Sequence, residues 1–374
     1  MPKIPLVDLK ANYARHKEGI DAAIKNVIDN TAFIQGPAVK EFEADFAAFS
    51  QAKYAVGVAS GTAALHLAMV AAGIGPGDVV ATPSHTFIAT VEAISYTGAT
   101  PKFIEIDPET GLMDPADLKK NIDGVKLVLP VHIHGRPVDL DAIGAICEEA
   151  GIPLIEDAAQ AQGSDYVKAD GTKVRCGSYG LAACFSFYPG KNLGAFGDAG
   201  AVTTNDEAFA KKVAQLRDHG RTSKYVHEIL GFPERLDTIQ AAILKVKLTT
   251  LDADNERRRE IAKRYTEKLA GVGDLKTPPE TPSLISNYHH YVLRTAHRDA
   301  LEAFLKDNGV GVVIHYPVPV HLQPSYADLG YKKGDLPVTE AYADSIVSLP
   351  IFPELTDEQA DFVVEQVKKF YETV

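Results

Sequence analysis

One lysine stands where it could act as a nucleophile. The run Phe185–Phe187 is typical of a hydrophobic strand, and it leads into a turn, bordered by Gly190 and Gly194, that presents Lys191. A lysine amine becomes nucleophilic when it is desolvated or lies near another cation, and it forms Schiff bases with carbonyl groups. Most loop lysines are simply solvated, so Lys191 is a candidate nucleophile only if the groups around it support that role.

The segment Ile155–Gln160 supplies acidic and amide side chains. It places Glu156, Asp157 and Gln160 at the carboxyl end of a strand that should be buried. A carboxylate in such a place needs a cationic partner, and a protonated ring nitrogen would serve. The ordinary alternative is an aspartate that caps the next helix.

A third segment is suited to holding an anion. Ser60, Gly61 and Thr62 connect an expected strand to an expected helix, where free backbone N–H groups, the helix dipole and a hydroxyl converge. A plain helix cap is the alternative here too. Taken together, an anion seat, a buried acid and a Schiff-base lysine are what a site for pyridoxal 5'-phosphate (PLP) requires.

These segments lie within a regular alternation of short apolar runs and helical patterns between Lys53 and Thr204. Strands are expected at 54–59, 79–82, 102–106, 127–131, 153–155, 184–187 and 201–203, and helices at 62–72, 87–96 and 140–150. This alternation predicts a largely parallel sheet covered by helices. Ligands of such sheets bind beyond the carboxyl ends of the strands, which is where the three segments fall.

The C-terminal part has a different pattern. A long charged helical stretch, Leu236–Leu269, precedes a linker with three prolines, Lys276–Ser283. We therefore predict a large domain over residues 1–274 and a smaller α+β domain over residues 275–374. Within the smaller domain, strands are expected at 288–293 and 312–315, a helix at 299–308, and closing helices from Val338 and from Asp357.

Composition excludes several classes of protein. The chain has 374 residues and a net charge of −12, which disfavours nucleic acid as a partner. Its densest basic run, Arg257–Arg259, is interspersed with glutamates and predicts a solvated helix surface. The three cysteines lack metal spacing. His132 and His134 suggest a metal pair at first sight, but by the family resemblance given below they occupy a strand-end motif, so no metal is assigned. No apolar run approaches the roughly 18 residues of a membrane span, and the N-terminus lacks an apolar signal region, so we expect a cytoplasmic protein without a membrane partner.

The chain resembles the DegT/DnrJ/EryC1/StrS family of PLP-dependent sugar aminotransferases. The resemblance runs nearly end to end, through IPLVDLK from Ile4, SGTAALHLA from Ser60, GIGPGD from Gly73, HTFIAT from His85, IEDAAQAQG from Ile155, FSFYPGKNLGA from Phe185, GDAGAVTTND from Gly197, ERLDTIQAAIL from Glu234 and HYPVPVHLQP from His315. It implies the aspartate aminotransferase fold (fold type I), an α/β fold with a mostly parallel seven-stranded sheet in the large domain and a smaller α+β C-terminal domain.

The resemblance also implies roles for individual residues. Lys191 would carry the cofactor and move the proton during transfer, Asp157 would pair with the pyridine nitrogen, and Gln160 would bond the ring hydroxyl. Phe87 would stack on the ring, although a core phenylalanine is its alternative. The phosphate would be held by Gly61, Thr62 and Ser186.

The substrate side and the subunit arrangement follow from the same resemblance. His315, Tyr316 and His321 are candidates for the sugar pocket, and the family's sites are shared across a homodimer. Many relatives carry an asparagine at position 233 that reaches the partner's cofactor phosphate, but this chain has Pro233, which offers neither amide nor N–H. Either the phosphate has one partner fewer, or a group such as Lys224 or His227 replaces it. Arg235 is expected to reach the neighbouring site and meet the substrate's diphosphate or a carboxylate, with a surface or helix-pairing role as its alternative.

The expected reaction moves an amino group from L-glutamate to a keto group, at C3, of a dTDP-linked keto-deoxysugar. A UDP-linked 3-keto uronic acid is the alternative substrate, followed by amination at C4. A regulatory homologue without turnover would be expected to have lost Lys191 or Asp157, and both are present. A nicotinamide dehydrogenase is disfavoured because the first strand turn lacks GxGxxG.

Overall fold

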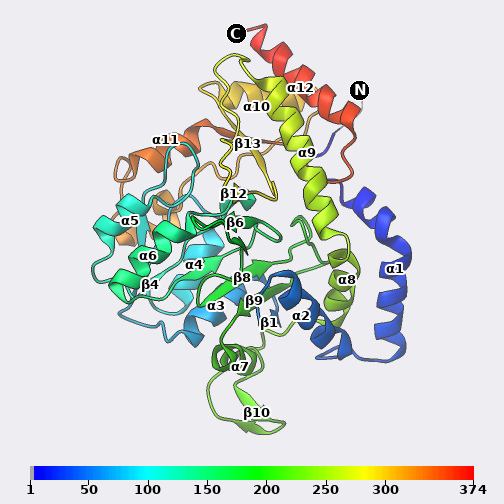
Figure 1. Ribbon diagram of the computed structural model, residues 1–374, viewed down its shortest axis with the longest axis vertical. Coiled ribbons are helices and arrows are strands. Elements are labelled where there is room, and N and C mark those ends of the chain that lie inside the picture. The colour runs from blue at the N-terminus through cyan, green and yellow to red at the C-terminus, as the bar shows by residue number, and fades with distance from the viewer. Residues whose placement is uncertain (1–3) are drawn as a thin grey trace.

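The computed structural model describes residues 4–374 and centres on a twisted sheet (Figure 1). Its first part has the strand order β1 (Tyr54–Val58), β9 (Gly200–Thr204), β8 (Ala182–Ser186), β5 (Ile155–Asp157), and its second part the order β3 (Thr100–Ile104), β2 (Val79–Pro83), β4 (Leu127–Val128). Parallel bridges from Val128 to Leu154 and from Val131 to Asp157 join β4 to β5. In these seven strands β9 runs antiparallel to its neighbours and the other pairings are parallel, in agreement with the expected sheet.

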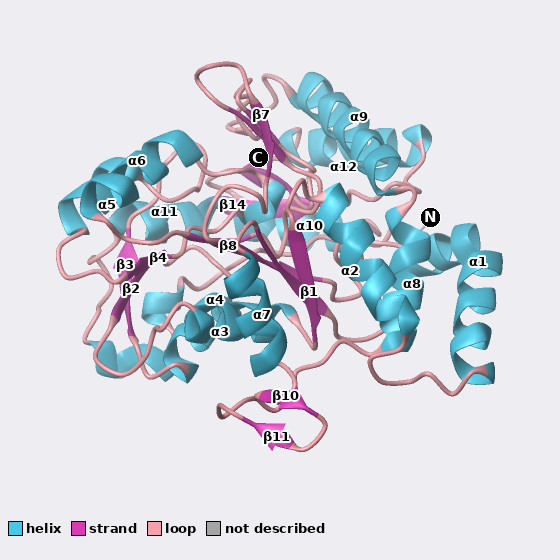
Figure 2. Ribbon diagram, turned by 60° about the horizontal axis from the view of Figure 1, so that its bottom comes forward, coloured by secondary structure: helices cyan, strands magenta, loops and turns pink. Residues whose placement is uncertain are grey.

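Helices cover both faces of this sheet (Figure 2). Successive residues of β8 contact different helices. Cys184 packs in one layer with α3 (Gly61–Ala71), α4 (Ile88–Tyr96) and α7 (Glu207–Leu216). Ala183 and Phe185 pack in the opposite layer with α2 (Pro37–Phe49) and α8 (Thr238–Leu248). Successive strand residues point to opposite faces, so an entirely apolar strand requires two apolar layers. Helices α5 (Pro115–Asn121) and α6 (Leu140–Ala150) cover β2 and β4.

The long helical stretch expected at Leu236–Leu269 is two helices. Helix α8 ends at Leu248, and α9 (Leu251–Leu269) begins three residues later. The sequence LTTL at the junction carries no proline or glycine, so the sequence has no strong signal for the break between the two helices. Helix α1 (Leu9–Asp29) packs against α8.

The C-terminal part has its own core. Strands β13 (Tyr291–Arg294) and β14 (Ile346–Leu349) pair antiparallel beside α10 (Arg298–Asp307), α11 (Pro337–Ser345) and α12 (Asp357–Tyr371). The strand expected at 312–315 is reduced to a single bridge between Val313 and Ser348, and β14 was not expected. This core also contains Ile4 and side chains of α9, so the division at residue 274 stays a prediction.

Shorter elements complete the fold. Strands β6 (Asp165–Val167), β7 (Lys173–Arg175) and β12 (Leu284–Ile285) form a small sheet, and β10 (Arg221–Ser223) and β11 (Val226–His227) form a hairpin that projects at the bottom of Figure 1. One-turn or two-turn 3₁₀ helices lie at Ile133–Gly135, Val320–Leu322 and Pro324–Leu329. Among the described residues, no helix is both long and apolar enough to cross a membrane.

Candidate active site

A cavity of about 600 Å³ opens at the carboxyl ends of the parallel strands. Its lining contains nine of the predicted cofactor and substrate residues: Gly61, Thr62, Phe87, Asp157, Gln160, Ser186, Lys191, His315 and Tyr316. They come from strand ends and helix starts that are far apart in the sequence. The fold therefore assembles the three chemical segments, and two of the substrate candidates, around one space.

Lys191 is held in a fixed turn after β8. Its backbone N–H donates to the carbonyl of Tyr188 at 2.8 Å, and the buried Nζ of Lys247 donates to the carbonyl of Gly194 at 2.6 Å. The neighbouring Asn192 donates from Nδ2 to Oδ1 of Asn255 at 2.9 Å. Burial lowers the pKa of Lys191 to about 8, against the opposing effect of Asp157, so a substantial fraction of the amine is neutral near pH 8.

Asp157 lies buried at the end of β5. One carboxylate oxygen accepts a hydrogen bond from Oγ1 of Thr90 at 2.7 Å, and the other accepts from the N–H of Ala159 at 3.1 Å. Burial nevertheless raises the pKa of Asp157. A cationic N–H in the cavity would give this carboxylate the partner that burial demands.

Gln160 and Phe87 border the same cavity. Oε1 of Gln160 accepts from the N–H of His134 at 2.5 Å, and its Nε2 donates to the hydroxyl of Tyr316 at 3.2 Å. Phe87 precedes α4, has 52% of its surface exposed, and has its ring 5.5 Å from that of Tyr316. An aromatic side chain left this open does not act as core packing.

The start of α3 forms an anion cradle. Ser60 caps the helix by accepting from the N–H of Ala63 at 3.0 Å, and the first N–H groups of a helix have no intrahelical partner. A side chain at Gly61 would place its Cβ 2.6 Å from Cβ of Ser186. Glycine thus lets the end of β8 approach the helix terminus closely, and a phosphate fits the donors that result.

Two predicted substrate residues lie outside the cavity lining. Arg235 donates from Nη1 to Oδ1 of Asp218 at 2.8 Å. His321 is buried, and its two ring nitrogens contact Oγ of Ser84 at 2.7 Å and Oε1 of Glu340 at 3.1 Å. His321 therefore ties structural elements together within this chain, and any contact of Arg235 with a site would have to be made in another subunit.

Several lining residues were not predicted from the sequence. Thr90, His289, His290 and Arg258 border the cavity. The interpretation of Arg257–Arg259 as a solvated surface is wrong for Arg258, which is only 3% exposed. Helical periodicity turns one of three consecutive residues inward, and that signal was available in the sequence.

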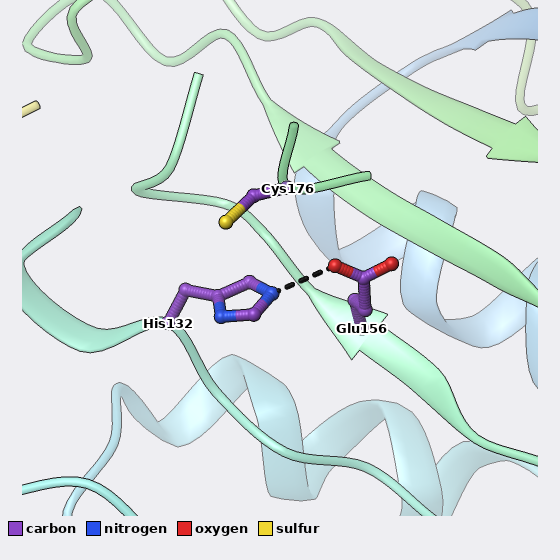
Figure 3. Close-up of side chains that lie close together, drawn as sticks. All are labelled: His132, Glu156 and Cys176. Carbon is purple, nitrogen blue, oxygen red and sulfur yellow. Dashed lines mark hydrogen bonds and ion pairs between the residues drawn. The ribbon is translucent and has the colours of Figure 1, made fainter. Parts of the chain in front are cut away.

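His132, Glu156 and Cys176 form a buried cluster with metal-like composition (Figure 3). The Nδ1 atom of His132 accepts from the N–H of Val138 at 3.1 Å, so Nε2 carries the proton and donates to Glu156 at 2.9 Å. Glu156 also accepts three backbone N–H bonds, and burial raises the pKa of the Cys176 thiol. These ligand atoms already hold the loops around β5 together, and within residues 4–374 we assign the cluster no metal.

A buried lysine with a lowered pKa, a buried acid and an anion cradle at the edge of a mostly parallel sheet define a PLP-dependent enzyme of the aspartate aminotransferase fold. The chain belongs to the DegT/DnrJ/EryC1/StrS aminotransferase family, whose sequence model matches residues 14–368.

Known proteins similar to this chain include a transaminase and a protein named for a regulatory role. The dTDP-3-amino-3,4,6-trideoxy-alpha-D-glucose transaminase of Streptomyces venezuelae is 43% identical, over 100% of this chain and 97% of its own length. The pleiotropic regulatory protein of Geobacillus stearothermophilus is 45% identical over 98% of each chain. The crystal structure of Streptomyces venezuelae DesV, at 43% identity, superposes with a TM-score of 0.96 over 100% of both chains. Similar solved structures include PLP and PMP (pyridoxamine phosphate) forms, and PLP is the cofactor of this enzyme.

Proposed function

We propose that this aminotransferase moves an amino group from L-glutamate to the C3 keto group of a dTDP-linked keto-deoxysugar. The observation that carries the proposal is the meeting of Lys191, Asp157 and the α3 terminus in one cavity. The 43% identity with a dTDP-3-amino sugar transaminase over the full chain supports the choice of sugar.

Different residues bind the cofactor and transfer the proton. When bound, PLP supplies an electrophilic carbonyl and a ring that withdraws electrons. Lys191 is the attachment point and, once released, the base that moves a proton at the substrate carbon, for which a pKa of about 8 is suitable. Asp157 keeps the ring nitrogen protonated, and Gly61, Thr62 and Ser186 hold the phosphate.

The sugar is proposed to enter beside His315 and Tyr316. Both side chains line the cavity, and the hydroxyl of Tyr316 is fixed by the amide of Gln160. Their rings offer apolar faces to the hexose, and their polar atoms can bond its hydroxyl groups. The exposed ring of Phe87 is proposed to stack on the ring of the cofactor.

We also propose that the enzyme is a cytoplasmic homodimer with shared sites. The hairpin region carries exposed apolar side chains, including Tyr225 at 81% and Leu230 at 96%. Apolar surface of this kind on a projecting element favours a subunit contact. In such a dimer Arg235 would meet the substrate in the neighbouring site. Either Lys224 or His227 would bind the neighbouring cofactor phosphate in place of the group that Pro233 lacks, or that phosphate has one partner fewer.

A product assay tests the sugar assignment. PLP-loaded enzyme is incubated with L-glutamate and either a dTDP-linked 3-keto-6-deoxyhexose or a UDP-linked 3-keto uronic acid, and the products are identified by NMR. We expect a 3-amino product from the dTDP sugar, with kcat/KM at least tenfold above that for the UDP sugar. The reverse preference would replace the proposed substrate by its alternative, and no aminated product from any sugar would refute the function.

A further inference from the structure

The cavity contains few groups that can bind a negative charge. Within the described chain, its lysines and arginines are Lys191 and Arg258 alone. Its histidines, His289, His290 and His315, have pKa values lowered by burial and are neutral at pH 7. Since Lys191 takes part in the reaction itself, Arg258 is the permanent cation available to an anionic substrate.

Arg258 is rigidly held but incompletely bonded. The side chain leaves α9 on its buried side, and Nη1 donates to the carbonyls of Ile351 at 2.7 Å and of Tyr288 at 3.3 Å. Nε and Nη2 donate to no group in residues 4–374, and no carboxylate of that range lies within 4 Å of the guanidinium. Nε is fully enclosed, whereas Nη2 is the unpaired nitrogen that a carboxylate oxygen can reach.

The acids nearest to Arg258 are already paired with another arginine. Asp254 and Glu354 both form ion pairs with Arg15, at 2.6 and 3.4 Å, and the same two acids are the carboxylates that act on Lys247 and Arg258. Among the described residues Arg258 therefore has no ion pair of its own. A buried guanidinium without a direct carboxylate partner gains from binding an anion.

Arg258 also lies near the reacting lysine. The ring of His289 contacts Oδ1 of Asn192, the residue after Lys191, at 3.1 Å. The pKa of His289 is lowered by burial and further by the positive charges of both Lys191 and Arg258. Lys191, His289 and Arg258 all line the cavity, so both cations border the same space.

We propose that Arg258 binds a carboxylate of the amino donor, so that the donor's amine is directed toward the cofactor position at Lys191. This inference rests on the proposed function and adds to it the residue that selects an amino acid as donor. The ligand is identified by its chemistry: an amino acid carrying one or two carboxylates.

Direct binding of a non-reactive dicarboxylate tests the inference. Glutarate, which has no amine, is titrated into PLP-loaded wild-type enzyme, Arg258→Gln and the matched control Arg259→Gln by calorimetry. Arg259 is the adjacent residue of α9 and pairs with Glu256 at 2.9 Å on the helix surface. We expect the Kd for glutarate to rise at least tenfold in Arg258→Gln, to recover in part in Arg258→Lys, and to change less than twofold in Arg259→Gln. An unchanged Kd in Arg258→Gln would overturn the inference.

Half-reaction rates show which carboxylate Arg258 binds and whether it acts on the donor or on the sugar. If Arg258→Gln slows the half-reactions with L-glutamate and L-glutamine alike, Arg258 binds the α-carboxylate; if only L-glutamate is slowed, it binds the side-chain carboxylate. The half-reaction of PMP-loaded enzyme with the keto-sugar should change less than threefold, and a loss confined to that step would assign Arg258 to the sugar and refute the proposal.

Two controls keep the test decisive. If Arg258→Gln fails to hold PLP, wild-type enzyme is titrated with glutarate and with its uncharged diamide, and equal affinities would refute carboxylate binding. A wild-type enzyme that binds glutarate but is not converted by any amino acid would refute the proposed function rather than the binding site.

Discussion

Lys191 and Asp157 are both buried at the same cavity. Burial lowers the pKa of Lys191 and raises that of Asp157, so each side chain is poorly accommodated as an isolated charge. A cofactor with a carbonyl for the amine and a basic ring nitrogen for the acid removes both difficulties. Two groups in one cavity whose pKa values are both shifted indicate a functional site.

Replacing Lys191 by alanine should abolish covalent attachment of PLP and lower the transfer rate by about 10²–10⁴-fold, because both the attachment point and the proton-transfer base are lost. Borohydride reduction followed by mass spectrometry of the intact chain measures attachment. Lys211→Ala, a lysine whose side chain is 74% exposed, is the matched control and should retain the adduct. A stable adduct in Lys191→Ala would place the attachment elsewhere.

Covalent loading of the cofactor-free protein with PLP should depend on pH with a midpoint near 8. The neutral amine is the nucleophile, and burial lowers the pKa of Lys191 from 10.5 to about 8, so the rate should rise through pH 8 and level off above it. Stopped-flow absorbance measures this rate, with Nα-acetyl-lysine, whose pKa is about 10.4, as the reference. A midpoint near 10 for the protein would show that Lys191 is solvated.

At the scale of elements, we propose that the close approach of β8 to the start of α3 forms the phosphate site. Gly61→Ala should raise the Kd for PLP at least tenfold, because its Cβ would stand 2.6 Å from that of Ser186. Equilibrium dialysis measures the affinity. Gly75→Ala, where the nearest atom would be 4.0 Å away, should bind PLP as the wild type does. Equal affinity for PLP in both variants would show that the start of α3 does not bind the phosphate.

The sequence predicted the elements whose pattern is local, and missed those that depend on tertiary contacts. Helix α6 was placed with its observed bounds, because an aspartate cap and a following glycine mark its ends. Strand β14 was missed because it follows α11 without a turn signal, and its apolar residues are explained only by pairing with β13. Arg258 is a different case. Helical periodicity already indicates that one of the three consecutive arginines points inward, and the packing of α9 against the C-terminal core shows which one it is.

At the scale of the whole molecule, the projecting hairpin region predicts a dimer. Leu230→Glu should weaken association at least tenfold, since burying a leucine contributes roughly 1.5–3 kcal/mol and a buried carboxylate would cost more. Sedimentation equilibrium measures the dissociation constant, and activity should fall with dissociation if the sites are shared. An active wild-type monomer would contradict both the dimer and the shared sites.

The central claim, that Lys191 and its surroundings form an aminotransferase site, is tested most directly by the absorbance spectrum of the PLP-loaded enzyme. L-glutamate is added without any sugar, and the visible band of the bound cofactor is followed. The account predicts that the band disappears while PMP and 2-oxoglutarate form in equal amounts, and that it returns when a keto-sugar is added. A visible band that persists in the presence of L-glutamate and other amino acids would contradict the account.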